Sequence, residues 1–213
     1  MIVWRDSNEN SVVELPEIQI IPGTAATPSE NFERFAIGQE PEFMWLGCSD
    51  SRLAVNDVTA TGPGEIFIHR NVANLFVADD TNAQAVLQYA VEALKVRHVI
   101  VCGHYGCGGV RAAIEGGASG PLGAWLANIA ALYAAHHAEM DGLSLEERWD
   151  RMVELNTIAQ VQRLRDASVI QSAWARGQGL SLHGWVYRVG SGVLHELVAI
   201  EAPLGNAAPL QVP

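Results

Sequence analysis

The sequence predicts an α/β fold with a mostly parallel central β-sheet flanked by helices and an antiparallel edge strand in a C-terminal hairpin. Two short and largely apolar runs, 43–47 (FMWLG) and 98–103 (HVIVCG), have the composition of strands buried on both faces. Between them, residues 80–96 carry apolar side chains at helical spacing. Strands that alternate with helices favour crossover connections, and therefore parallel pairing.

The chain is expected to form one domain behind an N-terminal arm. Its 213 residues suffice for a single domain with a sizeable core. Residues 1–28 contain three prolines among short apolar runs, so we expect a poorly defined extended arm there, with a disordered tail as the alternative. Residues 29–213 show neither an internal repeat nor a linker, and they are expected to form a single α/β domain.

The first elements after the arm are a helix and two strands. In the segment 29–38, Ser29 can cap a helix and Gly38 can end it. The apolar run at 43–47 is the first strand of the sheet. Residues 65–70 (EIFIHR) form the next strand, after a glycine–proline turn.

Helices and a hairpin are expected in the rest of the chain. Asp80 or Thr81 can cap the helix at 80–96, and the strand at 98–103 follows it. Residues 180–200 alternate in polarity and should fold as a hairpin. The other expected helices are 106–117, 122–139 and 144–165, and the hairpin turn is expected at 190–192.

Composition excludes several kinds of partner. The net charge is −11 and Lys95 is the only lysine, whereas binding of nucleic acid needs a basic surface. No apolar run approaches the ~20 residues that span a bilayer, so no membrane is expected. The first twenty residues lack a basic segment followed by an apolar one, which favours the cytoplasm; an organelle stays open if a leader was trimmed. Three irregularly spaced cysteines favour a reducing compartment.

Metal-ligating residues follow two of the expected strands. Cys48, Asp50 and Arg52 come directly after the first apolar run, and His104 and Cys107 come directly after the second. In open α/β sheets, ligands bind at the carboxyl ends of the strands. Two thiolates and one imidazole form a zinc site with a fourth position open for water, which is the pattern of a catalytic site. The alternative is that these residues are buried thiols and a packed histidine.

The neighbours of these ligands indicate how such a site could work. Cys107 lies where a helix is expected to begin, and the positive end of a helix favours a thiolate. Two thiolates make zinc a weaker Lewis acid, so an acceptor near the metal-bound water becomes important. Asp50 is suited to that role, and Arg52 can keep Asp50 ionised and oriented. Cys102 lies inside the apolar strand and is expected in the core.

These motifs resemble those of the β-class carbonic anhydrases. The resemblance extends from about residue 31 to residue 197, and its motifs occur in the family's order and spacing. They are GQEP at 38–41, WLGCSDSR at 45–52, GPGEIFIHRNVAN at 62–74, GHYGCGGV at 103–110 and HGWVY at 183–187.

The resemblance implies a zinc enzyme that hydrates CO2 reversibly to bicarbonate and a proton, by attack of zinc-bound hydroxide. Residues 29–213 would then be a zinc-binding catalytic domain with one Zn2+ per subunit. By position, Cys48, His104 and Cys107 would hold zinc, Asp50 would accept a hydrogen bond from the hydroxide, and Arg52 would orient Asp50. Substrate would contact Gln39, Phe67, Tyr89 and Gly108.

In the family, the first three of these substrate-contacting residues come from a neighbouring subunit. A homodimer, or a tetramer built from two dimers, is therefore implied, with the active site at the subunit interface.

A further resemblance concerns regulation. Trp45, Arg70 and Tyr187 match the positions that bind an inhibitory bicarbonate in the type II subgroup. In the inactive state of that subgroup, Asp50 would leave Arg52 and become the fourth zinc ligand. The alternative is that Trp45 and Tyr187 only pack and that Arg70 pairs with a carboxylate.

Two other functions stay open on the same fold. One is hydrolysis of carbon disulfide or carbonyl sulfide, and the other is a non-enzymatic, zinc-bearing bicarbonate sensor.

Overall fold

The structure is a computed structural model that describes residues 3–5, 12–14, 33 and 35–202. The chain divides into two compact units, 1–38 and 39–213. In the first unit, strands β1 (Val3–Arg5) and β2 (Val12–Glu14) pair antiparallel. Residues 33 and 35–37 are helical, within the helix expected at 29–38, whereas its expected cap Ser29 lies outside the described residues.

The second unit is built on a five-stranded sheet with the order β4-β3-β5-β6-β7. The first four strands are parallel and β7 runs antiparallel to β6, so the predicted fold class is confirmed. The strands are β3 (Phe43–Cys48), β4 (Ile66–Asn71), β5 (His98–His104), β6 (Ser181–Arg188) and β7 (Val193–Ile200).

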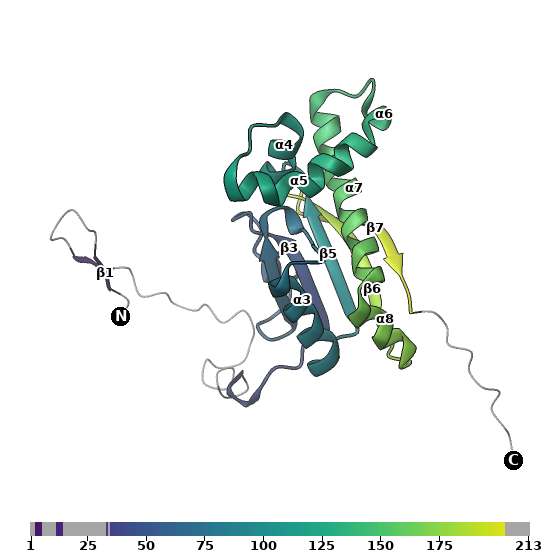
Figure 1. Ribbon diagram of the computed structural model, residues 1–213. Helices are drawn as coiled ribbons and strands as arrows, with labels where there is room; N and C mark the ends of the chain where they lie inside the picture. The colour runs from purple at the N-terminus through teal and green to yellow at the C-terminus, as the bar shows by residue number, and fades with distance from the viewer. Residues whose placement is uncertain (1–2, 6–11, 15–32, 34, 203–213) are drawn as a thin grey trace, which may run out of the picture. The chain divides into compact units, whose positions relative to one another are not determined.

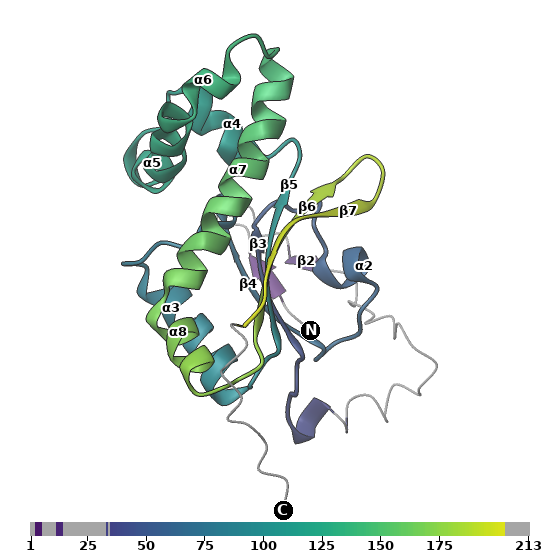
Figure 2. The same cartoon turned by 90° about the vertical axis from the view of Figure 1, so that its right-hand side faces the viewer.

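Helices cover one face of this sheet, and Figure 2 shows them on the side opposite α2. Asp80 caps α3 by accepting from the backbone N–H groups of Asn82 and Ala83, as predicted. The helices over this face are α3 (Thr81–Gln88) with its π-helical continuation η2 (Tyr89–Ala93), α7 (Leu145–Asp166) and α8 (Ser168–Ala175). Beyond the carboxyl ends of the parallel strands lie α4 (Gly108–Glu115), α5 (Gly120–Ala135) and α6 (His137–Met140).

Some elements differ from those expected. The predicted single helix at 122–139 is two helices, because the chain leaves helical geometry at His136. The helix at 80–96 changes to π-helical geometry at Tyr89 and ends at Ala93, two residues before Lys95, whose φ is +57°. The sequence did not predict α2 (Val55–Thr59) or α8, which are short helices of five and eight residues.

The long helix α7 lies along the sheet, as Figure 1 shows, and begins with a capping box between Ser144 and Glu147. It comes so close to β5 that a Cβ on Gly103 would lie 2.3 Å from Thr157 Oγ1 and 3.1 Å from Val153 Cγ1. Because Gly103 directly precedes His104, this contact fixes the end of β5 against the helix.

Replacing Gly103 with alanine should destabilise the protein, because the added methyl group has no room between β5 and α7. Overpacking of this kind costs about 1–3 kcal/mol of unfolding free energy. Urea unfolding at one protein concentration measures the loss. Gly190→Ala is the matched control, since nothing in the described part of the chain lies within 4 Å of a Cβ at that turn position. Equal stability of the two variants would contradict the close packing.

Candidate metal centre and active site

Two neighbouring strands end at the candidate metal ligands. Strand β3 ends at Cys48, and the parallel strand β5 ends at His104. From β3 the chain continues to β4 on one side and then crosses to β5 on the other. The site therefore lies where the strand order reverses, which is the usual position of ligands in open α/β sheets.

The three candidate ligand atoms converge. Sulfur and nitrogen atoms of Cys48, His104 and Cys107 all lie within 4.8 Å of one another, and all three residues are buried. The two Sγ atoms are 3.9 Å apart. Tetrahedral zinc with Zn–S bonds of about 2.3 Å requires a sulfur separation of about 3.8 Å. The residues therefore fit zinc.

The imidazole of His104 is oriented for a metal. Its Nδ1 lies 3.2 Å from the carbonyl oxygen of Tyr105, which can only accept, so Nδ1 carries the proton. The side chain is fully buried, and Nε2 has no hydrogen-bond partner among the described residues. A buried nitrogen lone pair without a partner is unfavourable unless a cation binds it.

The two thiols lie within hydrogen-bond distance of each other. A hydrogen bond from Cys107 lowers the pKa of Cys48 to about 4. The same hydrogen bond and burial raise the pKa of Cys107. Cys107 is the N-cap residue of α4, as the sequence predicted. Binding of a divalent cation supplies the charge that both thiolates need.

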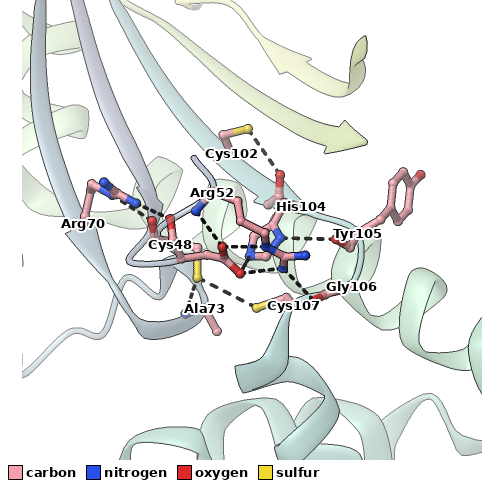
Figure 3. A network of polar contacts seen from close by, with 11 residues as sticks. Cys48, Arg52, Arg70, Ala73, Cys102, His104, Tyr105, Gly106 and Cys107 are labelled. Atoms are coloured by element: carbon pink, nitrogen blue, oxygen red, sulfur yellow. Dashed lines mark hydrogen bonds and ion pairs between the residues drawn. The ribbon is translucent and has the colours of Figure 1, made fainter. Parts of the chain in front are cut away.

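Asp50 and Arg52 form a bidentate ion pair beside the ligands, and Figure 3 shows the network that surrounds them. Arg52 Nε donates to Asp50 Oδ1 at 2.9 Å, and Nη2 donates to Oδ2 at 2.7 Å. This pair holds the pKa of Asp50 well below its usual range. Asp50 Oδ2 lies 3.7 Å from His104 Nε2, and Arg52 Nη2 also reaches the carbonyl of Gly106 at 3.3 Å.

The three residues predicted to bind bicarbonate lie on the sheet face that carries α2. Trp45 is buried there in a cluster with Val55 of α2, and Tyr187 packs against the same cluster. Arg70 pairs in register with Gly47, two residues after Trp45. The guanidinium of Arg70 donates to the carbonyl oxygens of Cys48 at 2.8 Å and Asp50 at 2.6 Å.

The predicted substrate residues are not gathered around the chain's own ligands. Phe67 and Tyr89 contact each other, with ring centroids 5.7 Å apart. Phe67 precedes Asn71, the register partner of Cys48, by four residues, which is about 13 Å along a strand. Gly108 begins α4 next to Cys107, and Gln39 is exposed.

Comparisons with known proteins agree with this geometry. A family profile described as carbonic anhydrase matches residues 43–194. A carbonic anhydrase of Emericella nidulans is 41% identical over 195 residues, which cover 91% of this chain and 85% of that protein. The chain belongs to the β-class carbonic anhydrases.

Solved β-carbonic anhydrases have the same fold. The Coccomyxa enzyme, solved with acetazolamide, matches with a TM-score of 0.78 and 40% identity, covering 81% of this chain and 79% of that one. One of two tetrameric enzymes of Sordaria macrospora matches with a TM-score of 0.77 and 37% identity, covering 81% of this chain and 89% of that one.

The chain is thus a carbonic anhydrase with zinc as its cofactor. The structure also reveals a contact to the metal ligands that the sequence analysis did not assign. The backbone N–H of Ala73 lies 3.4 Å from Cys48 Sγ. The segment 69–74 was recognised as a family motif, but a backbone donor leaves no signal in residue type.

Replacing Cys107 with alanine should abolish stoichiometric zinc binding, because only two ligands would remain. Replacing Cys102 with alanine should leave it unchanged. Cys102 is equally buried, but its Sγ donates to the carbonyl of Gly103 and burial raises its pKa. Metal analysis after dialysis measures zinc per chain. Loss of zinc from the Cys102 variant, or its retention by the Cys107 variant, would contradict the assigned ligand set.

Proposed function

We propose that this carbonic anhydrase hydrates CO2 reversibly at zinc held by Cys48, His104 and Cys107, with Asp50 and Arg52 acting on the water. The observation that carries the proposal is the convergence of the three ligand atoms beside an ion-paired carboxylate. Bound zinc supplies the Lewis acidity that lowers the pKa of a water molecule. The substrate is neutral, so the net charge of −11 does not repel it.

Asp50 acts as a hydrogen-bond acceptor. Its carboxylate stays ionised because Arg52 pairs with it through two hydrogen bonds, and an ionised carboxylate can only accept. Oδ2 is also the oxygen that lies 3.7 Å from His104 Nε2. It can therefore accept from a hydroxyl near the ligands and hold that oxygen's lone pair toward CO2.

A second subunit completes the substrate pocket in this proposal. Phe67, near the start of β4, and Tyr89 beside it lie at the opposite end of the strand from the metal ligands of the same chain. The side chain of Tyr89 is 50% exposed. Strand β4 is an edge strand, and Ile68 and Val72 at this edge are 38% and 37% exposed. Burial of this surface in a homodimer would carry Gln39, Phe67 and Tyr89 to the partner's site, beside Gly108.

Replacing Asp50 with asparagine should lower CO2 hydration by about 10²-fold or more, the range expected for loss of a positioned proton acceptor. Zinc content should not change, since the ligands remain. Stopped-flow CO2 hydration on protein of known zinc content measures the effect. Asp57→Asn on α2, which changes an exposed carboxylate, is the control. Full activity of the Asp50 variant would contradict the proposed role.

Assays of the unaltered, zinc-loaded protein with each substrate separate the alternative functions. Hydrolysis of carbon disulfide or carbonyl sulfide without hydration of CO2 would show that the substrate is not CO2. A zinc-loaded protein without any turnover would favour a bicarbonate sensor.

No helix in the described part of the chain is long and apolar enough to cross a membrane. The cytoplasmic location stays a prediction.

We also propose that bicarbonate inhibits this enzyme in the way described for the type II subgroup, by binding to Trp45, Arg70 and Tyr187. A Cβ on Gly47 would lie 2.3 Å from Trp45 Nε1, so the indole N–H lies over Gly47, the register partner of Arg70. Indole, guanidinium and the phenol of Tyr187 are donors suited to a small oxyanion.

Arg70 offers a physical route from these three donors to the metal. Its guanidinium binds the carbonyls of Cys48 and Asp50, so an anion on Arg70 would compete with both bonds. Loosening the backbone of Asp50 would weaken its pairing with Arg52. The carboxylate, already close to His104 Nε2, could then take the fourth position on zinc.

Replacing Tyr187 with phenylalanine should weaken bicarbonate inhibition roughly tenfold or more, because one hydrogen bond to an anion is lost. The variant should also keep more activity than the unaltered protein on the acid side of the pH profile. CO2 hydration with added bicarbonate measures the inhibition constant, with Tyr133→Phe as the control. Inhibition and acid-side activity identical to those of the unaltered protein would refute the switch.

A further inference from the structure

A backbone amide donates to one of the metal-ligating sulfurs. Ala73 N lies 3.4 Å from Cys48 Sγ, and both residues are buried, Ala73 completely. Figure 3 shows Ala73 beside the sulfur, on the side away from Arg52. A sulfur that accepts such a bond donates less electron density to a metal. A hydrogen-bond donor can therefore raise the Lewis acidity of a metal that it does not contact.

The turn that carries this amide is strained. Ala73 has φ +63° and ψ +29°, and Asn74 has φ +48°, a region that residues other than glycine seldom adopt. Such a conformation is unfavourable and persists only where its surroundings hold it. The Asn71 side chain bridges the N–H and carbonyl of Leu75, both at 2.7 Å, which closes the turn locally.

Helix α7 holds the same turn from outside. Asn156 Nδ2 donates to the carbonyl oxygen of Ala73 at 3.0 Å. Gln160, one helical turn later, donates to Asn156 Oδ1 at 2.8 Å and accepts from the backbone N–H of Phe76 at 2.9 Å. Asn156 and Gln160 are each 1% exposed. Buried hydrogen bonds on both sides of Ala73 therefore connect α7, through the backbone of this residue, to the Cys48 sulfur.

The helix itself is fixed against the other half of the metal site. Thr157 packs at Gly103, directly before His104. Glu154 accepts a hydrogen bond from the hydroxyl of Tyr105 at 2.8 Å. One helix thus contacts both the turn that carries Ala73 and the segment that carries His104 and Cys107, so the position of Ala73 is set relative to His104.

We propose that Asn156 is a positioning residue that tunes the metal centre, by holding the Ala73 amide in hydrogen-bond contact with the Cys48 sulfur. Two thiolates make zinc a weak Lewis acid. The amide withdraws electron density from one of them and so partly restores the acidity that activation of water needs. This inference rests on zinc binding by Cys48, as proposed above.

The decisive test uses the Co2+-substituted enzyme, whose thiolate-to-metal charge-transfer band reports electron donation by sulfur. Asn156→Ala should shift this band to longer wavelength, because the freed sulfur donates more strongly. Asn156→Leu, which fills the same volume without a donor, should give the same shift and serves if the alanine variant does not fold.

Thr157→Val is the matched control. Thr157 is the adjacent residue and is fully buried, and its hydroxyl donates to the α7 carbonyl of Val153. Valine has the same shape, so the packing at Gly103 is kept and only this bond within α7 is lost. A purely structural role of Asn156 would lower stability in all three variants and leave every band unchanged. An unshifted band in folded Asn156 variants would therefore overturn the proposal, as would an equal shift in Thr157→Val.

The zinc enzyme gives a second readout. In the Asn156 variants the pH–activity profile should move to higher pH, and the activity on its high-pH plateau should not change. Well below the midpoint, the activity should fall about tenfold, which is the low end of the 10–100-fold effects that hydrogen-bond partners of metal ligands have. An unmoved midpoint would contradict the proposal. In the unaltered protein loaded with 113Cd, a scalar coupling should join the metal and the Ala73 amide proton, and its absence would also overturn it.

Absence of any thiolate-to-cobalt band in the unaltered protein would have a different meaning. It would contradict the metal site itself, and with it the proposed function. A normal band in the unaltered protein with no shift in the variants would leave that function intact and remove only the role of Asn156.

Discussion

The contact between α7 and the carboxyl ends of the central strands is the constraint on which the rest of the site depends. Gly103 and Gly184 have no side chains, so the helix lies directly on β5 and β6; a Cβ at Gly184 would come within 3.1 Å of Val161 Cγ2. This approach brings polar side chains of α7 to the turn at Ala73 and to Tyr105, which lies between the ligands His104 and Cys107. The surroundings of the metal site are therefore fixed by contacts with one helix.

Charge at the site is arranged by local pairs rather than by the surface as a whole. The chain carries a net charge of −11, yet Asp50 and the Cys48 sulfur each have a donor close by. Arg52 pairs with Asp50, Ala73 N–H contacts Cys48, and Arg70 binds two backbone carbonyls of the same loop.

Much of the site could be predicted from the sequence, because side-chain type carried the information. Cys48, His104 and Cys107 follow apolar strands, and parallel strands end at one edge of a sheet, so their convergence follows from topology. The pairing of Asp50 with Arg52 follows from charge and a spacing of two residues. The alternation of strands and helices likewise predicted the mostly parallel sheet.

What the sequence could not reveal depends on backbone geometry and on long-range contacts. The donor at Ala73 is a peptide N–H, and the positive φ of an alanine has no compositional signal. Asn156 and Gln160 look like solvent-facing polar residues until α7 is placed on the sheet. The helices α2 and α8 are too short for a clear periodic pattern, and the break at His136 follows no glycine or proline.

One zinc ion per chain, held where β3 and β5 end, is expected to generate the activity. Titration of zinc into metal-depleted protein, followed by stopped-flow CO2 hydration, measures how the activity depends on the metal. We predict a linear rise in activity that ends at one zinc per chain. Activity that does not depend on zinc, or that continues to rise well beyond one equivalent, would contradict the account.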